Sequence, residues 1–318
     1  MTEATHHRLT GLEPDNLLAF LALLGLLRAL DTARPEWRAR AYWDAEVQPL
    51  RLVLVLAETV TQETVAVAAA TGIAGIASAY QFDRDDLNYA RKDARELLES
   101  ADTPGAFPVM EALMSDGALR DDGSVWPSPF CFLFGQGHQH FLSRLAEIPR
   151  GQLPARLAKT RKPPDLNAPG LIAGTLFLPW TRADLTDGLR WDPAEDRRYA
   201  LRADDPSGDP AGMQHGANRL AAVGLPVMAG TIIRRRAEMR FLNAGTRYEA
   251  DGGIGFTWPI WTMPARLSGI RALLSHPALA EEEIRPDRLR PLGVAHAFRA
   301  RRISVGKFFN VTRARRIG

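Results

Sequence analysis

Residues 17–30 read LLAFLALLGLLRAL, and this stretch decides how the rest of the chain must pack. The preceding Asp15 and Asn16 are good helix N-caps, so the stretch predicts a helix that begins at Leu17. Its apolar side chains cover nearly every face, and a helix that is apolar all round is normally buried all round. Gly25 in its middle costs only about 1 kcal/mol relative to Ala and permits close packing. We therefore expect a buried leucine-rich helix.

The composition excludes several classes of protein. The chain of 318 residues is 46% hydrophobic and 24% charged, which is typical of a globular protein rather than a disordered one. The apolar run from Leu17 to Leu27 is shorter than the roughly 20 residues of a membrane-spanning helix, and the first residues lack the pattern of a secretory signal. One cysteine, Cys131, permits no internal disulfide and no multi-cysteine zinc site. We expect a cytoplasmic protein without cofactor or membrane partner.

The N-terminal part alternates between helical and strand-like patterns. Residues 51–57, RLVLVLA, and the apolar run at 130–134 predict strands. Residues 61–70 predict a helix that ends at Gly72, and a further helix is expected over 141–147. The leucine-rich helix therefore belongs to a region of mixed helices and strands.

The C-terminal part has a more β-like pattern. Residues 171–178 predict a strand, and beyond Pro226 strands are expected at 227–236, 239–242, 254–261 and within the alternating tail 295–317. Prolines interleaved with basic residues mark 149–170 as a linker or exposed loop. The prediction is an α+β fold with an N-terminal α/β region (1–148), a Pro/basic linker or loop (149–170) and a β-rich, Arg-rich region (171–318).

The net charge of +3 is unevenly distributed along the chain. Residues 231–318 hold 17 Arg and Lys against 7 Asp and Glu, whereas residues 1–230 hold 23 against 30. A basic C-terminal third is therefore joined to a mildly acidic remainder. This asymmetry predicts a polyanion partner for the basic end and protein neighbours for the rest.

The tail 291–318 contains no acidic residue and is the strongest candidate for contact with nucleic acid. A planar guanidinium can donate two hydrogen bonds to one phosphate, and nearby aromatic rings can stack on unpaired bases at about 1–3 kcal/mol each. A solvated basic surface is the alternative. We predict phosphate-backbone contacts from Arg299, Arg301, Arg302, Lys307, Arg313, Arg315 and Arg316.

A second basic group consists of Arg234, Arg235 and Arg236, together with Arg240 and Arg247. On a strand, alternate side chains point in opposite directions, so Arg234 and Arg236 are expected to share a face that Arg235 does not. These two join the predicted nucleic-acid contacts. Pairing of this group with the acidic front half of the chain is an equally good interpretation.

The segment 134–141, FGQGHQHF, is the remaining candidate for chemistry. Gln136, His138 and Gln139 are candidates for contact with a base or backbone, and an exposed polar turn is the simpler interpretation. His138 and His140 would need an acid from elsewhere to form a metal-dependent nuclease or hydrolase. The glycines do not form a P-loop, and motifs of nucleophilic catalysis are absent from the sequence. We therefore expect a protein that is not an enzyme.

Four blocks in the same order resemble one known family. They are LEPDNLLAFLALLGLLRAL (12–30), FGQGHQHF (134–141), RWDPAEDRRYALRADDPS (190–207) and GANRLAAVGLP (216–226). They are similar to segments of CRISPR-associated proteins of the type I-G (formerly I-U) systems, including the large-subunit-like proteins of that group. The blocks extend from about residue 9 to residue 226.

This resemblance implies the large subunit of a Cascade-type surveillance complex. Such a subunit reads the short motif that flanks the target DNA, stabilises the opened duplex and presents the complex to a recruited nuclease-helicase. The implied partners are target DNA, guide RNA and the backbone subunits. Catalytic residues are not carried over, because the large subunit is not known as the nuclease. A purely structural assembly subunit that binds RNA held by its partners is a further alternative.

Overall fold

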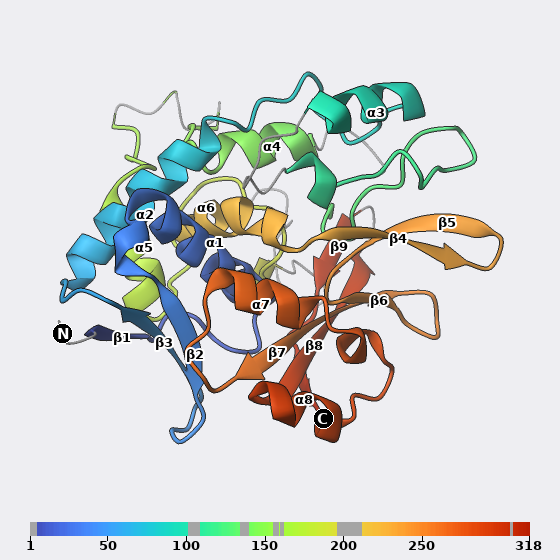
Figure 1. The fold of residues 1–318 in the computed structure, drawn as a ribbon. Coiled ribbons are helices and arrows are strands. Elements are labelled where there is room, and N and C mark those ends of the chain that lie inside the picture. Colours follow the sequence, from blue (N-terminus) through green and yellow to red (C-terminus); the bar gives the residue numbers. More distant parts are fainter. Residues whose placement is uncertain are drawn as a thin grey trace, which may run out of the picture.

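Helix α1 (Leu17–Ala33) lies at the centre of the fold, as its sequence predicts (Figure 1). The computed structural model describes residues 5–100, 109–133, 140–154, 159, 162–195, 212–305 and 308–318. Asn16 is the N-cap, and its side-chain oxygen accepts hydrogen bonds from the backbone N–H groups of Leu18 and Ala19. The side chains from Leu17 to Leu27 are all buried, so every face of the first three turns packs against protein.

Other helices surround α1 at very short range. Helix α2 (Gln62–Ala77) and helix α6 (His215–Gly224) both cross it. A Cβ atom on Gly25 would lie 1.8 Å from the carbonyl oxygen of Leu220 in α6, and one on Gly72 would lie 2.0 Å from that of Ala29 in α1. The prediction that Gly72 ends its helix is wrong, because this glycine admits the backbone of α1 in mid-helix.

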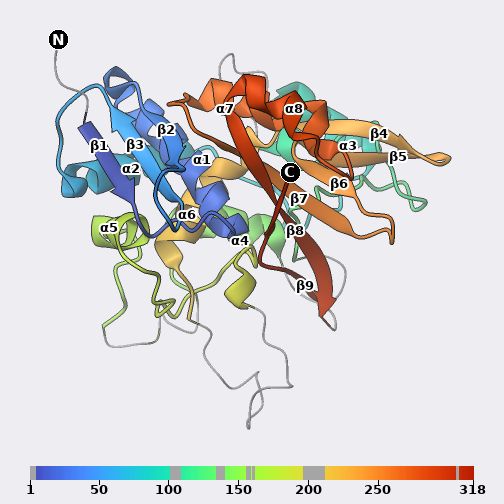
Figure 2. The same cartoon turned by 90° about the horizontal axis from the view of Figure 1, so that it is seen from below.

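The N-terminal strands form one antiparallel sheet. Strands β1 (Thr5–Leu9), β2 (Arg40–Asp44) and β3 (Arg51–Leu56) have the spatial order β1-β3-β2. Strand β3 confirms the strand predicted from RLVLVLA, and all its residues after Arg51 are buried. In Figure 2 this sheet lies on the opposite side of the molecule from the C-terminal strands.

The C-terminal strands form a second antiparallel sheet and a separate hairpin. The sheet has the order β10-β8-β7-β6, with β9 also paired to β8. The hairpin of β4 and β5 projects at the right of Figure 1. The strands are β4 (Gly230–Arg235), β5 (Glu238–Asn243), β6 (Thr246–Tyr248), β7 (Ile254–Trp261), β8 (Val294–Val305), β9 (Phe308–Val311) and β10 (Arg315–Ile317). Strands were predicted at 227–236, 239–242, 254–261 and within 295–317, and the structure has strands in each of these stretches.

The remaining helices complete an α+β fold, as predicted. They are α3 (Arg91–Ser100), α4 (Phe141–Glu147), α5 (Pro169–Phe177), α7 (Leu267–Leu274) and α8 (Pro286–Leu289). Short 3-10 turns lie at Pro35–Trp37, Met110–Ala112, Pro193–Glu195, Leu225–Val227, Pro277–Ala280 and Arg290–Leu292. Among the described residues, no helix is long and apolar enough to cross a membrane.

Two predicted strands are absent from the described residues. The apolar run at 171–178 lies in helix α5, which begins at Pro169, a residue favoured at the first position of a helix. Residues 130–133 are irregular, although Phe130 and Phe132 are fully buried. A short apolar run indicates burial without deciding between strand, helix and loop, which is why both predictions were wrong.

The two predicted regions share a single core. Phe20 of α1 stacks on Trp258 of β7, with ring centroids 5.4 Å apart. The buried apolar side chains form one cluster that runs from Leu9 to Val311. The boundaries at residues 148 and 171 stay a prediction, but the parts on either side of them are packed together.

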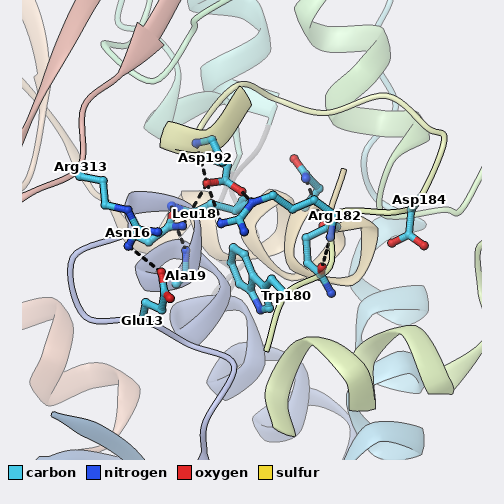
Figure 3. Close-up of polar contacts among 12 residues, drawn as sticks. Glu13, Asn16, Leu18, Ala19, Trp180, Arg182, Asp184, Asp192 and Arg313 are labelled. Carbon is cyan, nitrogen blue, oxygen red and sulfur yellow. Dashed lines mark hydrogen bonds and ion pairs between the residues drawn. The ribbon is translucent and has the colours of Figure 1, made fainter. Parts of the chain in front are cut away.

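A buried polar cluster joins the start of α1 to the middle of the chain (Figure 3). Asp192, 2% exposed, accepts from Asn16 Nδ2 at 3.1 Å and from Arg182 Nε at 2.7 Å. It also accepts from the backbone N–H of Ala194 and thereby caps the turn Pro193–Glu195. The carboxylate is thus held by groups of the protein itself, which indicates a structural role.

Candidate nucleic-acid interface

The alternation of strand β8 divides the arginines of the tail between two faces of the C-terminal sheet. Arg299 lies opposite Thr257 and Arg302 lies opposite Ile254 in the register with β7. Successive side chains of a strand point to opposite faces, so Arg299 and Arg301 share one face while Arg302 belongs to the other. The predicted contacts of the tail therefore do not form one continuous surface.

Arg299 is a structural residue rather than an exposed contact. Its side chain is only 8% exposed, and its Nε donates to Thr257 Oγ1 at 2.9 Å. Its two Nη atoms donate to the carbonyl oxygens of Glu282 and Glu281 at 2.7 and 2.6 Å. These three hydrogen bonds hold the guanidinium inside the protein, so the structure does not present Arg299 as the exposed phosphate contact that was predicted.

Arg301 and Arg313 form ion pairs with acidic residues. Arg301 contacts Asp251, and this hydrogen bond holds the pKa of the Asp251 carboxyl below its usual value. Arg313 Nη1 donates to Glu13 at 2.6 Å and to Asp15 at 2.8 Å. Exposed ion pairs of this kind are worth roughly 0–1 kcal/mol, so a phosphate can compete for either guanidinium.

Arg315 and Arg316 on β10 are exposed. Within the described part of the chain, neither has an ion-pair partner. Both remain accessible to a polyanion, on opposite faces of the sheet edge. The predicted contact Lys307 lies outside the described residues.

In the hairpin of β4 and β5, Arg234, Arg235 and Arg236 of the second basic group do not all lie as predicted. Arg234 is exposed on β4, but Arg236 lies beyond the strand in the turn, with a φ of 55°. Strand alternation therefore does not place Arg234 and Arg236 on one face. Arg235, the residue that was expected to point away from them, is half-buried and stacks on Tyr248 of β6.

Three arginines line one cavity, and each stacks on an aromatic ring. The guanidinium carbon lies 4.0 Å from the ring centre for Arg235 over Tyr248, 3.5 Å for Arg240 over Trp126 and 4.3 Å for Arg302 over Phe309. The cavity has a volume of about 320 Å³. We call it the arginine–aromatic cavity; its other described lining residues are Pro127, Pro129, Cys131, Phe241, Gly252 and Ile254.

Two of the three arginines of the arginine–aromatic cavity, Arg235 and Arg302, have no ion-pair partner among the described residues. Among the described residues that line it there is no Asp or Glu, although Arg240 contacts Glu238 beside it. Burial lowers the pKa of Arg302, and burial raises the pKa of the neighbouring Cys131 thiol well above its usual value. Cys131 is therefore uncharged at neutral pH and does not neutralise Arg302. A bound anion would offset the cost of burying this guanidinium.

A second, larger hollow lies on the other side of Arg235 and Tyr248. It has a volume of about 590 Å³ and extends from the hairpin to the end of α7. Arg234, Arg247 and His276 are among its lining residues, and Arg235 and Tyr248 line both hollows. The two hollows are therefore neighbours that share one wall.

The segment FGQGHQHF is only partly described. Gln136, His138 and Gln139 lie outside the described residues. His140 precedes helix α4, and its Nδ1 lies 3.6 Å from Asp85 and 3.9 Å from Asp86. Over the described ranges, no group of three or more His, Cys, Asp or Glu side chains could hold a metal ion.

Sequence reasoning identified the basic segments but missed how they meet. Trp126 and Tyr248 were not singled out, and Arg235, which lies on the opposite face of β4 from Arg234 as expected, was left out of the predicted contacts. Arg240 stacks on Trp126 from a distant segment of the chain, and no local spacing records such a contact. Arg302 and Phe309 are closer in the chain, on the paired strands β8 and β9.

Comparison of the chain with known proteins found no relative. No family model matches the chain, and neither a curated protein nor a solved structure matches it.

Proposed function

We propose that this protein is a non-catalytic nucleic-acid-binding subunit whose C-terminal strands contact the phosphate backbone. The observation that carries the proposal is the arginine–aromatic cavity, where three strands bring Arg235, Arg240 and Arg302 together without an acidic lining residue among those described. Planar cations beside aromatic rings suit a polymer of phosphates and bases. The exposed Arg234, Arg236, Arg315 and Arg316 extend the same basic character over the surface.

The cellular context of the proposal comes from the resemblance to type I-G CRISPR proteins. In that context the subunit works in the cytoplasm as part of a Cascade complex, with guide RNA and backbone subunits as its partners. It contacts target DNA near the flanking motif, stabilises the opened duplex and meets a recruited nuclease-helicase. In such complexes guide pairing reads most of the sequence, so a subunit of this kind needs phosphate anchors more than base contacts.

Charge reversal at the edge of the C-terminal sheet tests the proposed function. The double variant Arg315→Glu/Arg316→Glu changes two exposed side chains for which no ion pair is seen among the described residues. We expect binding of a labelled DNA oligonucleotide to weaken about tenfold or more, with a salt slope of log K reduced by about 2. Fluorescence anisotropy between about 50 and 200 mM salt measures both quantities.

The matched control is Arg34→Glu/Arg38→Glu. These exposed arginines flank the turn Pro35–Trp37 and belong to neither the C-terminal sheet nor its hairpin, and the net charge changes by the same amount. The control should bind like the unmodified protein. Equal losses in both double variants would show a non-specific charge effect and contradict the proposal. Binding of RNA but not of free DNA would favour the structural assembly subunit instead.

A further inference from the structure

The stacking in the arginine–aromatic cavity leaves hydrogen-bond donors free for a ligand. A guanidinium that lies on a ring uses its flat face for that contact, while its N–H groups point outward in the plane. Arg302 donates one of these, from Nη1 to the carbonyl oxygen of Pro129 at 3.2 Å. The Nε of Arg240 is buried without a hydrogen-bond partner among the described residues. The stacked arginines are thus held in place and still have N–H groups that can donate to a ligand.

The size and lining of the cavity restrict what can enter. A volume of about 320 Å³ lies at the lower end of the roughly 300–1,000 Å³ range of small-molecule sites. Pro127, Phe241 and Ile254 provide apolar wall beside the three cations. A ligand that matches both the cations and the apolar wall is small, carries an anionic group and has a flat apolar body. A base inside a duplex is stacked and paired, so it cannot enter without leaving the helix.

We propose that the arginine–aromatic cavity seats a single unpaired nucleotide, with its phosphate on the arginines and its base against the apolar and aromatic walls. The inference rests on the proposed nucleic-acid function and deepens it, because it makes unpaired strands the preferred partner. The larger hollow beyond Arg235 and Tyr248 then receives the neighbouring part of the strand.

Calorimetric titration of the full chain with deoxyadenosine 5′-monophosphate tests this site directly. We expect binding to be saturable and tighter than that of inorganic phosphate. Arg235→Gln and Arg240→Gln should each weaken it about tenfold, the usual effect of losing a charged hydrogen bond. Arg302→Lys keeps the charge but loses the planar fork, so it should weaken binding as well. Thermal unfolding of each variant confirms that it is folded.

Arg120→Gln is the matched control. Arg120 also lies over Trp126, at 5.6 Å from the ring centre, but it does not line the cavity. This variant should bind the nucleotide normally. Equal losses in Arg120→Gln and in the cavity variants would overturn the inference, as would equal affinity for nucleotide and inorganic phosphate.

Oligonucleotide binding separates the inference from the proposed function. If both hold, an oligothymidylate binds more tightly than a duplex of the same length, and Arg235→Gln removes this preference. If the oligonucleotide binds through Arg315 and Arg316 but the nucleotide does not bind, the function stands and the cavity site is wrong. If the nucleotide binds and no oligonucleotide does, the cavity site stands and the proposed function is wrong.

Discussion

Arg299 and Arg315 lie opposite each other in the pair of strands β8 and β10, yet their surroundings differ. Arg299 is buried and donates to Thr257 and to two backbone carbonyls, whereas Arg315 is exposed. Composition treats the two residues as equal contributors to a basic tail. At the scale of single residues, burial decides which arginines stabilise the fold and which are accessible to a ligand.

We expect Arg299→Ala to destabilise the protein strongly. It removes three hydrogen bonds donated by a cation and leaves the carbonyl oxygens of Glu281 and Glu282 without these donors. We expect the free energy of unfolding to fall by about 2–4 kcal/mol. Arg315→Ala, at an exposed position, should change it by less than about 0.5 kcal/mol. Urea unfolding followed by circular dichroism measures both. Similar stability for the two variants would contradict the structural role of Arg299.

At the scale of elements, the packing of α1 depends on glycines where helices cross. Gly25 lies against the backbone of α6, and Gly224 of α6 would place a Cβ 2.3 Å from the carbonyl oxygen of Leu21. Backbone atoms cannot move aside as the end of a flexible side chain can. Where α6 crosses α1, the two helix backbones therefore meet at close range, whereas the contact of α1 with β7 is made by side chains such as Phe20 and Trp258.

Gly25→Ala should consequently destabilise the protein although alanine favours helices. The added Cβ would lie 1.8 Å from the Leu220 carbonyl oxygen, and overpacking of this kind costs about 1–3 kcal/mol or more. The control is Gly174→Ala in α5, where a Cβ meets no atom within 4 Å. This change should be neutral or stabilising by up to about 1 kcal/mol. Differential scanning calorimetry shows which variant loses stability; a stable Gly25→Ala variant would disprove the close crossing.

The accuracy of the sequence predictions varied with the kind of element. Strand β3 and helix α1 were predictable because each has a long periodic or apolar pattern and clear flanking residues. Helix α5 was predicted as a strand, since a short apolar run has no periodicity that separates the two. Gly72 was interpreted as a helix end, because local propensity does not include the backbone of a helix that crosses it.

At the scale of the whole molecule, the N-terminal and C-terminal parts depend on each other for burial. Helix α6 covers α1, and Phe20 of α1 stacks on Trp258 of β7. Asp192 accepts hydrogen bonds from both the N-cap Asn16 and Arg182 (Figure 3). Arg313 of the C-terminal part forms ion pairs with Glu13 and Asp15. Residues of the N-terminal and C-terminal parts are therefore in direct contact, through both apolar and charged side chains.

A fragment of residues 1–148 should accordingly fail to fold by itself. Without α6 and β7, the leucine-rich helix would expose a continuous apolar face, which favours aggregation or a loosely packed state. We expect weak near-ultraviolet circular dichroism and binding of a hydrophobic dye. Co-expression with residues 149–318 should restore the near-ultraviolet signal and abolish the dye binding. A fragment that unfolds cooperatively on its own would show that the N-terminal region is an independent domain.

The sequence by itself determined that a leucine-rich helix is buried, that the fold is α+β and that the basic charge gathers in the last third of the chain. These properties follow from composition and short-range periodicity, which act through neighbouring residues. Only the tertiary structure decided that Arg299 is buried, that Arg235, Arg240 and Arg302 meet at one cavity, and that Trp126 and Tyr248 stack on two of them. Several of those contacts join segments far apart in the chain, such as Arg240 with Trp126, and their geometry depends on strand register and helix crossings that no local pattern contains.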